Sequence, residues 1–340
     1  MKVLIIGGTR FIGLRLVHQL SSSGHEVVLF HRGDSRADLP DSVRTVHGDR
    51  HHLSEHAVDL RGFGADVVVD MIAFTERDAR ELVATFRGAA GRLVVISSGD
   101  VYRDYGIFAR LEEGPIEATP VTEDGPLRRN LFITRASGSK PGDDLYEYEK
   151  ILVERVVLGD SELPGTVLRL PMVYGPGDYQ HRLAPYLKRM FEGRPAILLN
   201  EGMARWRCVR GYVEDVAAAI TLAVTNPLAA GRVYNVAEPS ALTEAEWVAR
   251  IAAVVGWSGS IVSVSGDKMP VPFNTAQDLT VDSTRIRSEL GYRESIDPDL
   301  ALQRTVAWQR ENLMEMKVDY DEEDRLLADS VPTIDDASGV

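Results

Sequence analysis

The first thirteen residues, MKVLIIGGTRFIG, constrain the fold more than any other stretch of the chain. Residues 2–6 form a short, β-branched apolar run, which is typical of a strand buried on both faces. Gly7 and Gly8 follow directly, and a helical pattern then begins at Phe11 and includes Gly13. A strand, a glycine turn and a helix in this order are typical of a dinucleotide-binding site, in which the helix N-terminus receives the phosphates. We therefore expect a dinucleotide to bind at this turn.

Basic residues near the turn favour NADP over NAD as that dinucleotide. The turn contains Arg10, whose guanidinium can hold a phosphate through two hydrogen bonds. The second expected strand, residues 26–30, is followed by His31 and Arg32. An NAD site usually has an acidic residue here, which accepts a hydrogen bond from the ribose 2′-hydroxyl. A cation favours a 2′-phosphate instead, although the nearby Asp34 could still supply a carboxylate.

The composition of the 340-residue chain indicates a soluble globular protein with one large or two modest domains. Its net charge of −13 argues against a general binder of nucleic acids or of anionic membranes. No apolar run reaches the roughly 18 residues that span a bilayer. Because the chain begins directly with a core strand, we expect no signal peptide and a cytoplasmic location. Cys208 is the only cysteine, so we expect neither a disulfide nor a metal site.

Strands alternate with helices over the first hundred residues. This alternation predicts an α/β fold of the Rossmann type, with a doubly wound parallel sheet. The expected strands cover residues 2–6, 26–30, 43–47, 65–71, 92–98 and 166–170. Ligands of such sheets bind beyond the carboxyl ends of the strands. One edge of the sheet should therefore bring together residues 7–13, 31–32, 49, 72–73 and 97–98.

The middle of the chain contains a long stretch without periodicity. Residues 103–143 include four prolines, and a stretch of this length without regular structure is uncommon in a compact domain unless it is functional or disordered. We interpret it as a partly ordered lid over the substrate side. Asp143 and Asp144 are then expected to cap a helix over residues 145–158.

The second half of the chain has a mixed pattern. We expect helices at residues 182–191, 213–224 and 244–255, and short strands at 196–199, 232–236 and 260–264. These elements predict a smaller mixed α/β lobe that binds substrate, with some strands and helices returning to the Rossmann core. The predicted units are a Rossmann domain (1–175), this lobe (176–318) and an acidic tail (319–340) that need not fold.

Tyr146 and Lys150 lie four residues apart in the sequence YEYEK. On a helix this spacing places both side chains on one face. An ammonium beside a phenol lowers the phenol pKa from about 10, so that the phenol can exchange a proton with a substrate hydroxyl. Ser98, at the end of the fifth expected strand, could hydrogen-bond the same oxygen. The neighbouring Tyr148 and Glu149 are interpreted as packing and solvent-exposed residues.

Together these features resemble the extended short-chain dehydrogenases/reductases of the nucleotide-sugar epimerase/dehydratase type. The matching motifs are GGTRFIG, ISSGDVY (96–102), YEYEK, LRLPMVYGPGD (168–178), YVEDVAAAI (212–220), RVYNVAE (232–238) and DSTRIRSELGY (282–292). The resemblance covers nearly the whole chain and implies an NAD(P)-dependent enzyme. It implies that Ser98, Tyr146 and Lys150 are catalytic, with Tyr146 as the acid/base. It also implies a homodimer formed through the helix that carries Tyr146.

The glycine turn and the resemblance together predict which residues contact the cofactor and the substrate. The cofactor residues are Gly7, Gly8, Thr9, Arg10, Phe11, Ile12, Gly13, His31, Arg32, Asp49, Arg50, Tyr146, Lys150, Pro171, Met172 and Val173. The resemblance places the last three beside the nicotinamide ring and Asp49 near the adenine. The expected substrate residues are Asp100, Tyr102, Arg207 and Arg210. Cys208 stands where sugar-nucleotide enzymes often have an arginine for the substrate pyrophosphate.

Several activities remain open. The leading hypothesis is an epimerase or oxidoreductase that acts on a secondary alcohol or ketone of a nucleotide-linked sugar. A dehydratase would use an acidic pair after the strand-end hydroxyl, and Gly99 and Asp100 supply half of it. An NADPH-dependent reductase is a further alternative. Residues 70–73 (DMIA), GGTRFIG and HRG also resemble the chloroplast stem-loop-binding proteins, so the alternative of another class is a non-catalytic NADP-sensing or RNA-binding module.

Overall fold

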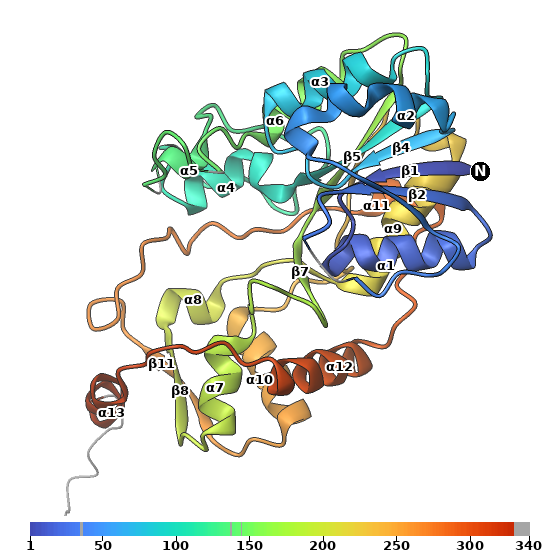
Figure 1. Ribbon diagram of the computed structural model, residues 1–340. Helices are drawn as coiled ribbons and strands as arrows, with labels where there is room; N and C mark the ends of the chain where they lie inside the picture. Colours follow the sequence, from blue (N-terminus) through green and yellow to red (C-terminus); the bar gives the residue numbers. More distant parts are fainter. Residues whose placement is uncertain (35–36, 137, 144, 330–340) are drawn as a thin grey trace, which may run out of the picture.

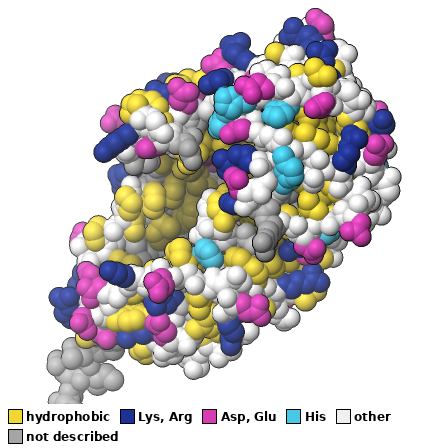
Figure 2. Space-filling view, in the orientation of Figure 1, with side chains coloured by type: hydrophobic (Ala, Val, Ile, Leu, Met, Phe, Trp, Pro, Cys, Tyr) yellow, Lys and Arg dark blue, Asp and Glu magenta, His cyan; other side chains and the backbone are white. Residues whose placement is uncertain are grey.

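The chain folds into a large α/β domain with a smaller lobe packed against it (Figure 1). The computed structural model describes residues 1–34, 37–136, 138–143 and 145–329. The expected cap Asp144 and the last eleven residues of the expected tail lie outside these ranges. The space-filling view shows a hollow between the large domain and the smaller lobe, with hydrophobic side chains on its wall (Figure 2). Among the described helices, none combines the length and the apolar character needed to cross a membrane.

A seven-stranded parallel sheet forms the centre of the large domain. Its order is β10-β6-β5-β4-β1-β2-β3, and every neighbouring pair is parallel. The strands are β1 (Lys2–Ile6), β2 (Glu26–His31), β3 (Arg44–His47), β4 (Val67–Asp70), β5 (Arg92–Ser98), β6 (Gly165–Leu170) and β10 (Val233–Asn235). The order reverses between β1 and β4, which is the switch point where ligands bind in sheets of this kind. The predicted Rossmann-type fold is confirmed.

Both faces of this sheet are covered, and the side chains of β1 show why. Val3 and Ile5 point into one apolar cluster, whereas Leu4 and Ile6 point into the other. Helices α1 (Phe11–Ser22) and α9 (Val213–Thr225) pack together on the first face. On the second face lie η1 (Arg50–His56), α2 (Ala57–Gly62), α3 (Glu76–Phe86) and α6 (Lys150–Leu158). A strand buried on both sides requires an uninterrupted apolar run, and the sequence has one here.

The smaller lobe is built around a two-stranded parallel sheet. Its strands are β8 (Ala196–Asn200) and β11 (Ser260–Val264). The helices of this lobe are α7 (Ala184–Phe191), α8 (Glu201–Arg205), α10 (Glu244–Val255) and α12 (Pro298–Glu311). Between the two parts, β7 (Met172–Tyr174) pairs with β9 (Arg210–Tyr212). The chain returns to the large domain in α9, η3 (Pro227–Ala229), β10 and α11 (Thr284–Leu290), so the domain boundary near residue 175 stays a prediction.

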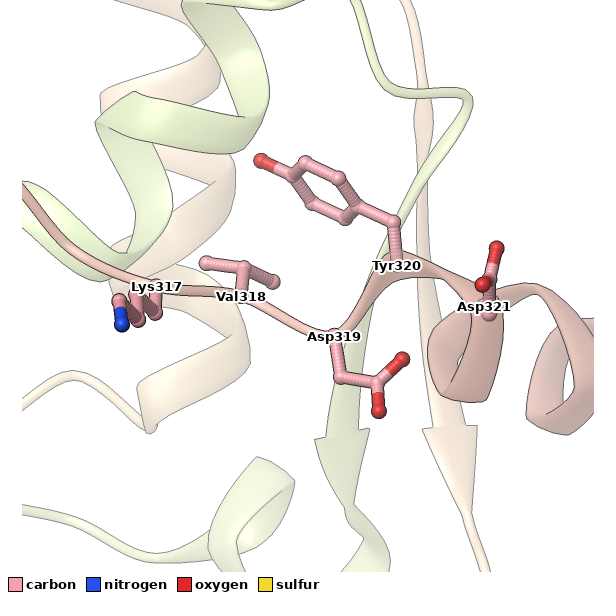
Figure 3. Close-up of a pocket in the computed structure, with 5 residues that line it drawn as sticks. All are labelled: Lys317, Val318, Asp319, Tyr320 and Asp321. Atoms are coloured by element: carbon pink, nitrogen blue, oxygen red, sulfur yellow. The ribbon is translucent and has the colours of Figure 1, made fainter.

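The expectation that the acidic tail need not fold is wrong for its first part. Residues Tyr320–Ala328 form α13, whose Leu326 and Leu327 pack on the apolar cluster of β8 and β11. Glu323 pairs with Arg189, and Asp324 pairs with Arg194. Figure 3 shows the segment that leads into this helix, where Asp319 caps the first turn. Apolar contacts and ion pairs with basic side chains of the smaller lobe both hold this helix, which composition alone does not reveal.

Residues 103–143, expected to form a partly ordered lid, contain two short helices. These are α4 (Arg103–Phe108) and α5 (Ile133–Ala136), and η2 (Gly99–Val101) precedes them. Val121 pairs with Val281 in an isolated parallel bridge, and Tyr102 pairs with Leu127. The middle of the segment, at Val121 and Leu127, is therefore paired with residues outside it. Its role as a lid stays a prediction.

Candidate active site

The glycine turn between β1 and α1 has the backbone geometry that is typical of dinucleotide-binding sites. Gly7 and Gly8 have φ values of 83° and 91°, which favour glycine because they lie in the left-handed region. A Cβ atom on Gly13 would lie only 2.3 Å from the Cα atom of Gly8. Helix α1 begins at Phe11, directly after Arg10 at its N-cap. The helix N-terminus therefore approaches the turn closely enough for its free N–H groups to meet a phosphate.

The other residues of the turn lie around the N-terminus of α1 and differ in exposure. Arg10 is exposed, Thr9 and Ile12 are half-buried, and Phe11 is buried. The Phe11 ring makes an edge-to-face contact with Tyr179, with centroids 6.3 Å apart. That a pyrophosphate lies over residues 7–13 stays a prediction.

The end of β2 presents a histidine and an arginine, as expected. The Nδ1 atom of His31 accepts a hydrogen bond from the Gly33 N–H at 3.1 Å, and its ring packs on His47 with centroids 4.8 Å apart. Burial and then the neighbouring His47 lower the pKa of His31, so this ring is neutral at physiological pH. Arg32 Nε lies 3.2 Å from Asp34 Oδ2, and both side chains are about two-thirds exposed. A cation and a carboxylate therefore compete at the site where a ribose 2′-substituent would lie.

Two further residues expected at the cofactor differ in their surroundings. The carboxylate of Asp49 accepts a hydrogen bond from the His51 N–H at 2.9 Å, which lowers the Asp49 pKa. Arg50, by contrast, is buried and lies 3.0 Å from Asp70 at the end of β4, with its Nη2 also donating to the carbonyl of Asp78 at 2.6 Å. Asp49 therefore lies just beyond the carboxyl end of β3, whereas Arg50 is buried and contacts the end of β4 at Asp70.

Ser98, Asp100, Tyr148 and Lys150 come together at the end of β5. The Ser98 hydroxyl accepts a hydrogen bond from the Asp100 N–H at 3.2 Å. The Tyr148 hydroxyl lies 2.7 Å from Asp100 Oδ2. The Lys150 ammonium donates to the carbonyls of Ala73 (2.7 Å) and Ile96 (2.8 Å) and lies 5.9 Å from the centre of the Tyr148 ring. Ser98 and Lys150 are therefore close to one another, as expected.

Tyr146 does not join this cluster. The expected helix over residues 145–158 begins only at Lys150, so Tyr146 lies in a turn, and the prediction that the two share a helix face is wrong. The guanidinium of Arg135 lies 4.3 Å from the centre of the Tyr146 ring, and its Nε donates to the Tyr146 carbonyl at 3.0 Å. The side chain therefore faces α5 rather than the end of β5.

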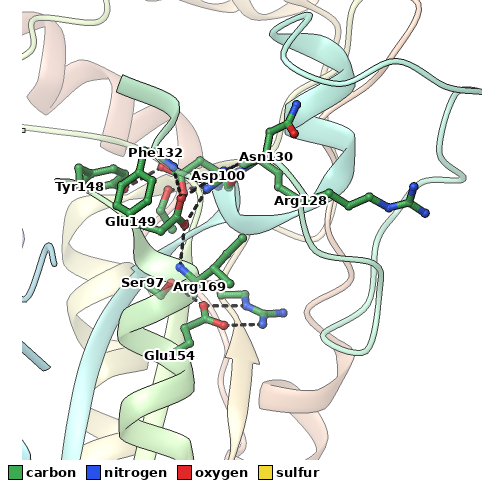
Figure 4. A network of polar contacts seen from close by, with 12 residues as sticks. Ser97, Asp100, Arg128, Asn130, Phe132, Tyr148, Glu149, Glu154 and Arg169 are labelled. Carbon is green, nitrogen blue, oxygen red and sulfur yellow. Dashed lines mark hydrogen bonds and ion pairs between the residues drawn. The ribbon is translucent and has the colours of Figure 1, made fainter. Parts of the chain in front are cut away.

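A buried ion pair explains where the helix begins. Glu149, expected in solvent, has a fully buried side chain that pairs with the equally buried Arg128 at 3.0 Å (Figure 4). Its carboxylate also accepts hydrogen bonds from the N–H groups of Ile151 (3.0 Å) and Phe132 (2.7 Å). Glu149 has extended backbone angles (φ −160°, ψ 96°), so it caps α6 instead of continuing it. Arg128 also donates to the carbonyls of Asp100 and Asn130, which ties the segment to the cluster.

Pro171, Met172 and Val173 lie at the same edge. Ser98 pairs with Leu170 at the end of β6, so the following proline is next to the cluster. Met172 packs on the side chains of Phe108, Trp206 and Cys208. That these three residues lie beside a nicotinamide ring stays a prediction.

The expected substrate residues are dispersed. Tyr102 is fully buried, and its hydroxyl donates to Asn235 at 2.6 Å and accepts from Arg169 at 2.8 Å. Arg210 is buried in an ion pair with Glu244. Arg207 is half-exposed and donates to the carbonyl of Ala241 at 2.8 Å. Asp100 is the substrate candidate that lies in the cluster at β5.

Arg207 lines a groove of about 520 Å³ between the large domain and the smaller lobe. Glu238, Asp278 and Arg287 are also in its wall. Cys208, where the resemblance leads us to expect an arginine, is buried, and burial raises the pKa of its thiol to about 12. Its side chain is therefore neutral and supplies no charge for a pyrophosphate.

Sequence reasoning did not anticipate the contributions of Tyr148, Arg128 and Glu149. Tyr148 was present in the quoted motif YEYEK, but its spacing from Lys150 gave no sign that it faces Asp100. Arg128 and Glu149 are 21 residues apart, and no local pattern pairs them. Only the folded chain brings these side chains together.

Comparison with known proteins assigns the chain to a family of enzymes. A model of the NAD dependent epimerase/dehydratase family matches residues 3–123 and 132–237. The chain belongs to this family of enzymes. Over 276 residues it is 29% identical to 2′-dehydrokanamycin reductase of Streptomyces kanamyceticus, covering 78% of this chain and 70% of that protein. Over 332 residues it is 30% identical to dTDP-glucose 4,6-dehydratase of Streptomyces griseus, covering 90% of this chain and 93% of that protein.

A solved structure has the same fold. The dTDP-glucose 4,6-dehydratase of Bacillus anthracis, determined in complex with NAD, superposes with a TM-score of 0.67 at 22% identity. The match covers 92% of this chain and 97% of that one. The expected family and the expectation of a dinucleotide-dependent enzyme are therefore confirmed.

Proposed function

We propose that the protein is an NAD(P)-dependent epimerase or oxidoreductase that acts on a secondary alcohol or ketone of a nucleotide-linked sugar. One observation carries the proposal: the glycine turn after β1 and the cluster of Ser98, Tyr148 and Lys150 lie at the same edge of the sheet. By name, the two relatives described above are a 2′-dehydrokanamycin reductase and a dTDP-glucose 4,6-dehydratase. The alternative of a non-catalytic module receives no support from them.

The side chains of the cluster have different roles in proton transfer. When bound, the nicotinamide supplies or accepts the hydride at the carbon that bears the substrate oxygen. Ser98 orients that oxygen through its hydroxyl, and a tyrosine of the segment 146–148 exchanges the proton. The Lys150 ammonium, held by two carbonyl groups, favours negative charge on the neighbouring oxygens. It would also bind the nicotinamide ribose.

NADPH binding should weaken as the pH rises through about 8. Burial lowers the pKa of Lys150 to about 8, while Asp100 and Asp70 oppose this shift. Above that pH the ammonium becomes a neutral amine, and a charge-assisted hydrogen bond worth about 1.5–3 kcal/mol is lost. Titration of NADPH by nicotinamide fluorescence between pH 6 and 10 measures the effect. Lys150→Met should bind NADPH weakly at every pH in this range; a wild-type affinity that is constant through pH 8 would contradict the assignment.

Arg32 should select NADPH over NADH. Arg32→Ala removes a cation that pairs with a 2′-phosphate, so the NADPH Kd should rise about tenfold, since charged hydrogen bonds contribute about 1.5–3 kcal/mol and Asp34 already offsets part of this. The NADH Kd should not change. Asp34→Asn is the matched variant, because it releases Arg32 and should tighten NADPH binding. Equal effects of Arg32→Ala on both dinucleotides would refute NADP selection at this position.

A separate experiment distinguishes the three reactions that the family performs. Purified protein would be incubated with dTDP-glucose or UDP-glucose and NAD⁺, and with 2′-dehydrokanamycin and NADPH. An epimerase or dehydratase returns its hydride, so it converts a nucleotide sugar without net change in nicotinamide absorbance. A reductase consumes NADPH in proportion to product. Failure to bind either nicotinamide dinucleotide would rule out the proposed function.

A further inference from the structure

Two tyrosines flank Glu147, and they face different parts of the molecule. Tyr148 points towards the end of β5 and contacts Asp100, as Figure 4 shows. Tyr146 packs under the guanidinium of Arg135 in the segment that contains α5. A proton donor must come within hydrogen-bond reach of the substrate oxygen. In the proposed function, that oxygen lies beside Ser98. Of these two phenols, that of Tyr148 contacts the cluster: it lies 2.7 Å from Asp100 Oδ2, and the Asp100 N–H donates to the Ser98 hydroxyl.

The buried ion pair keeps the two tyrosines in these positions. For Tyr146 to lie over Lys150 on one helix face, α6 would have to extend through Glu149 by a full turn. Glu149 would then lose its extended backbone and its hydrogen bond to the Phe132 N–H. It would also have to leave Arg128, whose fully buried guanidinium would lack its charge partner. A buried charge without its partner is costly, so the arrangement with Tyr148 at the cluster is strongly favoured.

The geometry allows Asp100 and Tyr148 to share a proton. The two oxygens lie 2.7 Å apart, so either group can be the donor, depending on which one carries the proton. The other oxygen of Asp100, Oδ1, is excluded from solvent. Burial raises the pKa of Asp100 and, together with the neighbouring carboxyl, that of Tyr148, and both changes favour the protonated groups. Lys150 opposes the shift at Asp100 and would stabilise a carboxylate there.

We propose that Tyr148, rather than Tyr146, gives the proton to the substrate oxygen, and that Asp100 replaces it. As hydride reaches the carbonyl carbon, the O–H bond of Tyr148 breaks and its proton passes to the substrate oxygen. The Asp100 carboxyl then transfers its proton to the phenolate and remains as a carboxylate beside Lys150. Solvent returns one proton to Asp100 when product leaves, and oxidation of an alcohol runs the same steps in reverse. The proposal rests on the proposed function for its hydride donor.

Tyrosine titration tests the proton pair without any substrate. The full-length protein would carry ¹³Cζ-labelled tyrosine, and the spectrum of Tyr148→Phe would assign the Tyr148 resonance. We expect Tyr148 to stay protonated well above pH 10 in the wild type, and to ionise at least one pH unit lower in Asp100→Asn. A Tyr148 resonance that titrates at the same pH in both proteins would overturn the pairing.

Turnover separates the two tyrosines. With the probe substrates named above, Tyr148→Phe should lower the rate by about 100-fold or more, the usual contribution of a general acid. Tyr146→Phe, the competing assignment, should change the rate less than threefold, and both variants should bind NADPH as the wild type does. Loss of turnover in Tyr146→Phe with retention in Tyr148→Phe would overturn the proposal. If the wild type binds neither dinucleotide, the proposed function fails, whereas the titration still decides whether Asp100 and Tyr148 share a proton.

Discussion

Gly13→Ala is expected to weaken the binding of both NADPH and NADH by about 100-fold. The added methyl group would lie 2.3 Å from the Cα atom and 3.0 Å from the carbonyl carbon of Gly8, and backbone atoms cannot move aside as a flexible side chain can. The glycine turn must therefore shift. Overpacking of this kind costs about 1–3 kcal/mol, and each charge-assisted hydrogen bond lost to the phosphates costs about 1.5–3 kcal/mol. Fluorescence titration with each dinucleotide measures the loss.

Gly62→Ala is the matched control for this substitution. Gly62 ends α2, and a Cβ atom there would meet no other atom within 4 Å. The same chemical change should leave dinucleotide binding as it is in the wild type. If Gly13→Ala bound NADPH as tightly as Gly62→Ala does, the close approach of α1 to the turn would not be what positions the phosphates.

Glu149→Ala is expected to lower the free energy of unfolding by about 3–5 kcal/mol, the usual cost of removing one partner of a buried ion pair. Arg128 would keep its charge in a site where its side chain is fully buried. The N–H groups of Phe132 and Ile151 would also lose their acceptor. Tyr148, which adjoins Glu149, would lose its fixed position beside Asp100, so turnover should fall as well. Urea unfolding followed by circular dichroism measures the stability change.

Glu147→Ala provides the control, since Glu147 is an exposed carboxylate two residues away. It should change stability by less than about 0.5 kcal/mol, as is usual for surface substitutions. Replacement of both partners, with Arg128→Met and Glu149→Leu together, should cost less than Glu149→Ala alone because no buried charge is left unpaired. A double variant less stable than Glu149→Ala would show that the charges themselves stabilise this segment.

The central sheet could be predicted from the sequence because its signals are local. The buried strands β1, β2, β4 and β5 are largely apolar stretches of four to seven residues, and glycine turns or helical patterns separate them. The helices predicted at 213–224 and 244–255 correspond to α9 and α10, because their apolar residues recur at the helical period. Two of the errors, the start of α6 and the fold of the acidic tail, involve charged residues. Their partners lie 21 residues away for Glu149 and more than 100 residues away for Glu323.

The sequence by itself determined the glycine turn after β1, the parallel sheet and which residues follow its strands at one edge. These follow from backbone requirements: glycine at positive φ or at a close approach, and apolar strands where both faces are covered. Only the tertiary structure decided which tyrosine faces Asp100. The sequence YEYEK permits either Tyr146 or Tyr148 to approach the end of β5, and the choice depends on Arg128, which reaches Glu149 from a distant segment. Burial makes that pair costly to separate, so a long-range contact overrides the local helical spacing.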